Sequence, residues 1–179
     1  SVGASNWTAP RLQALAEALA ERGQTPLASY HHSLAEVDPA LLPGSSRAAD
    51  PDMLAVVGRH RLPLLCWSAN AGGYFARTAP LPNGGPDMFD TPVSRARRER
   101  VRKLAEQSGV EPATVALAFT LSRDRTWVSV GPDSPDQLAQ AFAADALKLT
   151  PAERAWLRDG DRPQPPSTPK EPTSCAHSL

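Results

Sequence analysis

Short apolar segments alternate with longer amphipathic segments along most of this chain, and this alternation restricts the fold more than any other feature. Strands are predicted at 1–5, 26–30, 62–67 and 127–130, and helices at 9–22, 51–60, 94–107, 112–123, from 134 onward and from 150 onward. Strands joined through helices run parallel, with right-handed crossovers. Four such units predict either half of an eight-stranded (β/α)8 TIM barrel or a small open sheet of the flavodoxin type.

Capping residues and apolar periodicity support the helix boundaries. Asp50-Pro51 is a strong helix start, Gly23 a helix stop, and Thr150 with Glu153 forms a predicted capping box. The continuous apolar run 62–67 predicts a strand buried on both faces. Side chains at helical spacing mark one face of most predicted helices, and buried positions are predicted at Leu54, Val57, Val101, Leu104 and Ala105. The other residues noted in the helices are Leu12, Leu15, Ala16, Leu19, Val115, Ala118, Phe119, Ser122, Leu138, Phe142, Trp156 and Leu157.

Charge and cysteine content exclude several classes of partner. Lysine plus arginine and aspartate plus glutamate number 19 each, so the net charge is zero and a nucleic-acid partner is disfavoured. The arginine-rich run 95–103 is interpreted as a solvated helix face. No apolar run approaches the roughly 20 residues that cross a bilayer, and no signal peptide opens the chain. Cys66 and Cys175 form no disulfide framework, which favours a reduced, cytoplasmic protein.

The two ends of the sequence differ in character. Residues 1–5 resemble the end of a strand whose beginning is missing, which suggests a fragment, a processed product or a truncated chain. Residues 159–179 are rich in proline, serine, threonine and charge, which predicts a disordered tail. The predicted folded unit therefore spans 1–158.

In a parallel sheet, ligands gather at the carboxyl ends of the strands. Those ends carry Ser5-Asn6, then 29–31, then Trp67-Ser68, then Gly131-Pro132. Together with the segments 3–7, 72–75, 115–118 and 131–138, they resemble the C-terminal half of an aldo-keto reductase, in the bacterial branch related to potassium-channel β subunits. The resemblance runs from the first residue to about 157, and it implies strands five to eight of the family barrel.

The resemblance implies a surface for a nicotinamide cofactor, NADP(H) or NAD(H). Ser5 and Asn6 would hold the carboxamide, and the Trp67 ring would stack beneath the nicotinamide. Each assignment has a simpler alternative. Ser5 and Asn6 could cap the next helix, and Trp67 could be a core residue. The remaining implied contacts are with phosphate or adenosine: Ser68, Gly73, Arg77, Gly131, Ser134 and Gln137. Arg77 is equally compatible with simple exposure to solvent.

Several positions depart from the family pattern. Gln140 and Ala141 stand where an acidic residue and an asparagine are common, and the last loop lacks an arginine or lysine for the 2′-phosphate of NADP. The choice between the two cofactors therefore stays open. Ser29 stands at the place assigned to a glutamine that contacts the carboxamide, and Ala69-Asn70 replaces Pro-Leu. The sequence of the long loop 69–91 does not identify a substrate.

The family's catalytic tyrosine, lysine, aspartate and histidine belong to the first half of its barrel, so no catalytic residue is assigned here. Tyr30, with His31 or His32, is not expected to replace the catalytic tyrosine, because no nearby lysine lowers the tyrosine pKa. Adjacent histidines on a strand point to opposite faces, which disfavours a metal site. Two functions follow: the cofactor-binding part of a carbonyl reductase, inactive alone, or a non-catalytic nucleotide-binding or self-associating module that forms homodimers through its strand edges.

Overall fold

Four parallel strands form one sheet in a computed structural model that describes residues 2–81 and 84–160. The strands are β1 (Gly3–Ser5), β2 (Leu27–His31), β3 (Leu64–Trp67) and β4 (Thr126–Val128), and their order in the sheet is the order in the chain. A doubly wound sheet reverses its strand order at a switch point, and this sheet does not. The arrangement is that of a partial (β/α)8 barrel, so the parallel α/β class predicted from the alternation is confirmed.

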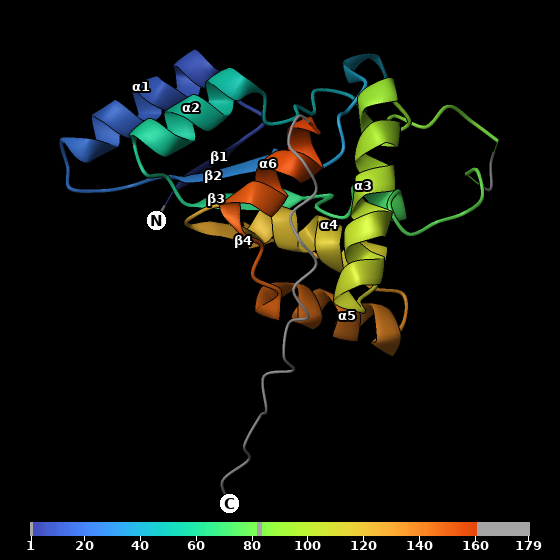
Figure 1. The fold of residues 1–179 in the computed structure, drawn as a ribbon. Helices are drawn as coiled ribbons and strands as arrows, with labels where there is room; N and C mark the ends of the chain where they lie inside the picture. The colour runs from blue at the N-terminus through green and yellow to red at the C-terminus, as the bar shows by residue number, and fades with distance from the viewer. Residues whose placement is uncertain (1, 82–83, 161–179) are drawn as a thin grey trace, which may run out of the picture.

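Within the described residues, six helices accompany the sheet; Figure 1 shows their arrangement. Their bounds are α1 (Ala9–Ala20), α2 (Pro51–Arg59), α3 (Pro92–Ser108), α4 (Pro112–Leu121), α5 (Pro135–Ala146) and α6 (Pro151–Asp159), with short 3-10 turns η1 (Pro39–Leu41) and η2 (Ala71–Gly73). The Asp50 carboxylate accepts from the Met53 backbone N–H at 2.7 Å, and the predicted capping box of Thr150 and Glu153 is present. None of the described helices is both long and apolar enough to span a bilayer.

One face of the sheet is covered by helices. Residues that share it by strand alternation and register are among the most buried of the described chain, at 4% exposure or less: Ala4, Ala28, Tyr30, Leu64 and Cys66. They join one hydrophobic cluster with side chains of the helices, including Leu12 of α1, Val57 of α2 and Val115 of α4. The core therefore lies between this face and the helix layer.

The opposite face of the sheet is largely open. Ser5, Ser29, Leu65 and Trp127 lie in register across its four strands; Ser5 is exposed, Ser29 and Leu65 are half-buried, and Trp127 is 54% exposed. The prediction that 62–67 is buried on both faces was wrong, because Leu65 and Trp67 are only half-buried. A strand of a parallel sheet is buried on both sides only when layers cover both faces of the sheet. Among the described residues, no helix layer covers this second face.

The arginine-rich face of α3 is not simply solvated. Arg97 donates to the backbone carbonyl oxygens of Leu34 and Arg158, at 2.9 and 3.0 Å, and Arg100 donates to those of Leu157 and Arg158, at 3.1 and 3.3 Å. These guanidinium groups bind the last carbonyls of α6, which carry no partner within their own helix. The interpretation of the run as a solvated surface was therefore wrong for Arg97 and Arg100, and it holds for the exposed Lys103.

Helix α5 does not bury its largest apolar side chains. Leu138 and Phe142, four residues apart, are 41% and 72% exposed, whereas Ala144 is buried. The helix packs against α4 through its small residues, and its larger apolar side chains point elsewhere. Helical spacing identifies an apolar stripe but not what covers it.

Candidate cofactor-binding edge of the sheet

The four strands end at one edge of the sheet. Ser5, the last residue of β1, lies in register with Ser29 of β2, and Trp67, the last residue of β3, lies in register with His31, the last residue of β2. Since neighbouring strands lie about 4.8 Å apart, β1 and β3 are separated by roughly 10 Å. Residues that follow these strands therefore begin at a common edge.

Ser5 and Asn6 leave β1 at this edge with part of their hydrogen-bonding capacity available. The Ser5 side chain is exposed. The Asn6 side-chain oxygen accepts from the Arg47 backbone N–H at 2.9 Å, which ties the loop before α2 to the end of β1. The predicted capping role is not seen, because Thr8 is the N-cap residue of α1. Asn6 retains its amide NH₂ as a donor.

Left-handed backbone conformations occur where two of the strands end. Asn6 has φ 61° after β1, and Ser68 and Ala71 have φ 52° and 50° after β3. The conformation is unfavourable for residues other than glycine, less so for asparagine, and it is concentrated at sites where the backbone serves a ligand or a switch. Arg61 and Arg125 adopt it at the opposite edge, in the turns that lead into β3 and β4.

Trp67 lies on the open face of the sheet rather than in a closed core. Its ring is half-buried and meets the imidazole of His31 edge to face, with ring centroids 5.0 Å apart. Phe89, from the loop before α3, stacks on the same imidazole, with ring centroids 5.4 Å apart. The three rings form an aromatic cluster at the ends of β2 and β3.

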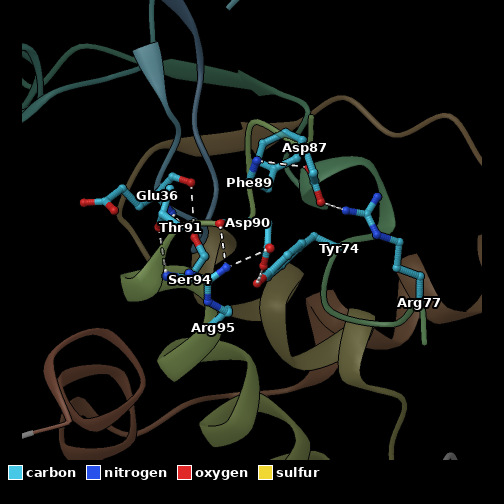
Figure 2. Close-up of polar contacts among 9 residues, drawn as sticks. All are labelled: Glu36, Tyr74, Arg77, Asp87, Phe89, Asp90, Thr91, Ser94 and Arg95. Atoms are coloured by element: carbon cyan, nitrogen blue, oxygen red, sulfur yellow. Dashed lines mark hydrogen bonds and ion pairs between the residues drawn. The ribbon is translucent and has the colours of Figure 1, made fainter. Parts of the chain in front are cut away.

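The loop after β3 is held in place by polar contacts with the start of α3 (Figure 2). The Tyr74 hydroxyl donates to the Asp90 carboxylate at 3.0 Å, and Arg95 pairs with the same carboxylate at 2.8 Å. The Ser94 side chain binds the backbone of Glu36, which connects the start of α3 to the loop after β2. Burial, followed by the contact with Asp90, raises the pKa of Tyr74.

Of the three predicted contacts in this loop, Ser68 is exposed, whereas Gly73 and Arg77 are engaged within the protein: the Gly73 N–H donates to the Asn70 carbonyl at 3.0 Å. Gly73 has φ 76° in the turn η2. The Arg77 guanidinium forms an ion pair with Asp87 and lies 5.5 Å from the centre of the Tyr74 ring. A phosphate group would have to compete with Asp87 for this guanidinium.

The last predicted contacts follow β4. Gly131 is exposed, and the Ser134 hydroxyl accepts from the Gln137 backbone N–H at 3.2 Å as the N-cap of α5. The Gln137 side-chain oxygen accepts in turn from the Asp133 backbone N–H at 2.8 Å. Ser134 and Gln137 are thus brought together at a helix N-terminus, where backbone N–H groups favour an anion.

A hollow of about 1110 Å³ lies on the β1–β2 side of this edge. Its lining includes Asn6 and His31 but neither Trp67 nor the loop after β4. Six arginines and two carboxylates line it: Arg11, Arg47, Arg97, Arg123, Arg154, Arg158, Glu36 and Asp50. The balance of charge suits an anionic group. Of the aromatic cluster, His31 lines this hollow, whereas Trp67 and Phe89 do not.

Tyr30 and His32 do not belong to the open face. Tyr30 is fully buried on the helix-covered face, and its hydroxyl donates to the backbone carbonyl of Trp7 at 3.0 Å. Burial, followed by the positive charge of Arg123, lowers the pKa of His32 to about 4. This position gives a geometric reason, besides the lack of a nearby lysine, why Tyr30 is not expected to substitute for a catalytic tyrosine.

Two residues of the aromatic cluster, His31 and Phe89, were not assigned to the site from the sequence. Alternation along β2 places His31 on the same face as Ser29, which was available as a signal. The pairing of His31 with Trp67 depends on the register between two strands more than thirty residues apart, and no local sequence pattern encodes this register. Phe89 reaches the site through a long loop, so its place depends on tertiary contacts.

Comparison with known proteins identifies a family. The sequence model of the aldo/keto reductase family matches residues 1–159. Versiconal hemiacetal acetate reductase of Aspergillus parasiticus is 27% identical over 172 residues, an alignment that covers 88% of this chain and 47% of that protein. The chain therefore spans about half the length of this relative.

Solved structures give the same picture of the fold. An aldo/keto reductase from Klebsiella pneumoniae, crystallised with NADP and acetate, is similar with a TM-score of 0.59 at 19% identity, covering 87% of this chain and 46% of that one. A thermostable aldo-keto reductase in complex with the inhibitor epalrestat has a TM-score of 0.52 at 15% identity, covering 79% and 42%. At these identities the similarity supports the fold.

Proposed function

This chain belongs to the aldo/keto reductase family, and we propose that it is the C-terminal, cofactor-binding half of an NAD(P)H-dependent carbonyl reductase. Its strands β1 to β4 then correspond to strands five to eight of the family barrel, in the branch related to potassium-channel β subunits, and 1–158 is the folded half. The tail predicted at 159–179 lies outside the described residues from 161 onward. One observation carries the proposal: strand ends bearing Ser5, Asn6 and Trp67 meet at one edge of a parallel sheet.

The side chains at this edge have the chemistry that the nicotinamide end of a cofactor requires. The Ser5 hydroxyl and the Asn6 amide supply hydrogen bonds for a carboxamide, and the Trp67 ring supplies a flat surface for a planar heterocycle. When bound, the cofactor would supply the hydride that reduces a carbonyl carbon. The residues of this chain would bind it and fix its orientation.

The two later loops have the chemistry of phosphate contacts. Ser68 is exposed after β3, Gly73 lies half-buried in the turn η2 that follows, and Gly131, Ser134 and Gln137 surround the N-terminus of α5. Arg77 would contribute only after releasing Asp87, so we expect it to matter less. The Klebsiella relative was crystallised with NADP, whereas the loop after β4 has no arginine or lysine at 129–137 for a 2′-phosphate. Both NADP(H) and NAD(H) are therefore proposed.

A titration of the 179-residue chain with NADPH and with NADH, followed by cofactor fluorescence, tests this function. We expect saturable binding by the wild type, and roughly three- to tenfold weaker binding by Trp67→Ala, because the stacking surface is lost. Trp127→Ala is the matched control: it removes a tryptophan from the same sheet face, in register with Leu65 rather than with His31. Absence of binding at millimolar cofactor would contradict the proposal.

We further propose that the chain alone reduces no carbonyl compound. The family's aspartate, tyrosine, lysine and histidine are assigned to the other half of the barrel, and Tyr30 is buried away from the open face. A small carbonyl substrate would then be turned over only after that half is supplied. Cofactor oxidation by the purified chain with a panel of aldehydes and ketones would contradict this.

The second candidate is a self-associating or nucleotide-binding module without catalysis. The observation that favours it is the open sheet face with two unpaired edges, β1 and β4, where Val2 and Trp127 are more than half exposed. Unpaired parallel edges accept further strands. A homodimer formed through these edges would bring eight strands together.

A further inference from the structure

The imidazole of His31 is a buried polar group that the fold leaves unpaired. The residue is 1% exposed, and neither Nδ1 nor Nε2 has a hydrogen-bond partner within residues 2–81 and 84–160. Burying a polar group without a partner costs stability, so such groups are few in native proteins and each requires an explanation. A ligand that supplies the missing hydrogen bonds is one such explanation.

The position of His31 connects it with Trp67. The two residues are register partners at the ends of β2 and β3, and their rings are in edge-to-face contact at 5.0 Å. Ser29, which stands where the family has a glutamine that contacts the carboxamide, pairs with Ser5 and Leu65, two residues earlier in the strand. At the level of Trp67, therefore, β2 presents His31 and not Ser29.

The chemistry of the imidazole matches a carboxamide. Burial lowers the pKa of His31, so the ring is neutral at pH 7 and carries one N–H donor and one nitrogen acceptor. A primary carboxamide offers the complementary pair, a carbonyl oxygen and an NH₂ group. A charged imidazolium would offer two donors and no acceptor.

We propose that His31, rather than Ser29, is the β2 side chain that hydrogen-bonds the carboxamide of a nicotinamide ring stacked on Trp67. The inference rests on the proposed cofactor function. It assigns to His31 the carboxamide contact that the family makes through a glutamine, the residue that Ser29 replaces in this chain. Phe89 covers the imidazole in the unliganded chain, so binding displaces this ring. Phe89 belongs to the loop 69–91, which includes Gly72, Gly73 and Gly84 at positive φ.

Three variants separate hydrogen bonding from packing. His31→Phe keeps an aromatic ring in contact with Trp67 and Phe89 but removes both nitrogens. His31→Gln keeps a donor and an acceptor but removes the ring. Ser29→Ala is the matched control on the same strand and the same face. Each is titrated with NADPH, with NADH and with ADP-ribose, which lacks the nicotinamide.

We expect His31→Phe to bind the reduced cofactors roughly tenfold more weakly than the wild type, and His31→Gln to bind within about threefold of it. Ser29→Ala should match the wild type. Binding of ADP-ribose should be unchanged in all three, because the adenosine and phosphate contacts lie in other loops. A second readout is the melting temperature without ligand, which should rise in His31→Phe because an unpaired polar group is replaced by an apolar one.

The possible outcomes are distinct. If His31→Phe binds as well as the wild type, or if Ser29→Ala is the weakened variant, the assignment of His31 is wrong while the cofactor function stands. Equal loss of ADP-ribose binding in His31→Phe would indicate a structural role and would also overturn the assignment. If the wild type binds no nicotinamide cofactor, the function and the assignment fail together.

Discussion

At the scale of single residues, the two adjacent histidines of the 31–32 pair have opposite environments. His31 contacts aromatic rings on the open face, whereas His32 lies near the Arg123 guanidinium. Strand alternation produces this division, since neighbouring side chains leave a strand in opposite directions. Each histidine is neutral at pH 7 because burial disfavours its charged form.

His32 predicts acid sensitivity of the fold. Its pKa falls from an ordinary 6.5 to about 4 in the folded chain, so the unfolded chain binds the proton more readily. The stability that depends on neutral His32 is fully present above pH 6.5 and is lost as the pH falls toward 4, by at most about 3 kcal/mol.

Urea denaturation of the wild type and of His32→Leu at a series of pH values tests this. The variant should lose less stability between pH 6.5 and pH 4, while the difference at pH 7.5 reports only the change in packing. Parallel curves for the two proteins across this range would show that His32 does not titrate as inferred.

At the scale of secondary-structure elements, α3 holds the end of α6 through charged side chains. Arg97 and Arg100 donate to the carbonyls of residues 157 and 158, and Gly160 ends α6 with φ 76°. The boundaries of each helix follow from capping residues close in sequence, whereas the contact between the helices joins segments about 60 residues apart. Sequence periodicity identified the arginines as a surface stripe because it contains no information on such a partner.

Arg100→Met should destabilise the chain by about 1 kcal/mol, because two carbonyls of α6 lose a charged donor in a partly exposed setting. Methionine retains most of the aliphatic length. Lys103→Met on the exposed side of the same helix is the control and should change stability by less than about 0.5 kcal/mol. Equal urea midpoints for both variants would mean that the contact contributes nothing measurable.

At the scale of the whole molecule, the covered and open faces of the sheet determine how the chain meets other proteins. The exposed large apolar side chains include Val2 beside β1, Trp127 on β4, and Leu138 and Phe142 on α5, the helix that follows β4. In a barrel, the helix after a strand covers the junction with the next strand. The exposed face of α5 therefore lies where a further strand would pair with β4. With zero net charge, two copies do not repel.

The purified chain is therefore predicted to self-associate through its strand edges. Light scattering coupled to size exclusion at micromolar concentrations should give a mass of at least a dimer for the wild type. Trp127→Lys, which places a charge at the β4 edge, should shift it toward the monomer, whereas Ala14→Lys on the exposed side of α1 should not. A monomeric wild type, or dimers unaffected by Trp127→Lys, would contradict association at this edge.

By itself, the sequence determined the four strands, the six helices, their parallel connection and the caps at Asp50, Thr150 and Glu153, because these depend on periodicity and on residues a few positions apart. Tertiary structure alone decided which sheet face is open, that Leu138 and Phe142 are exposed, that Arg77 pairs with Asp87, and that His31 stands level with Trp67. Those features depend on strand register and on contacts between distant segments. A local sequence pattern does not indicate whether another layer covers an apolar face.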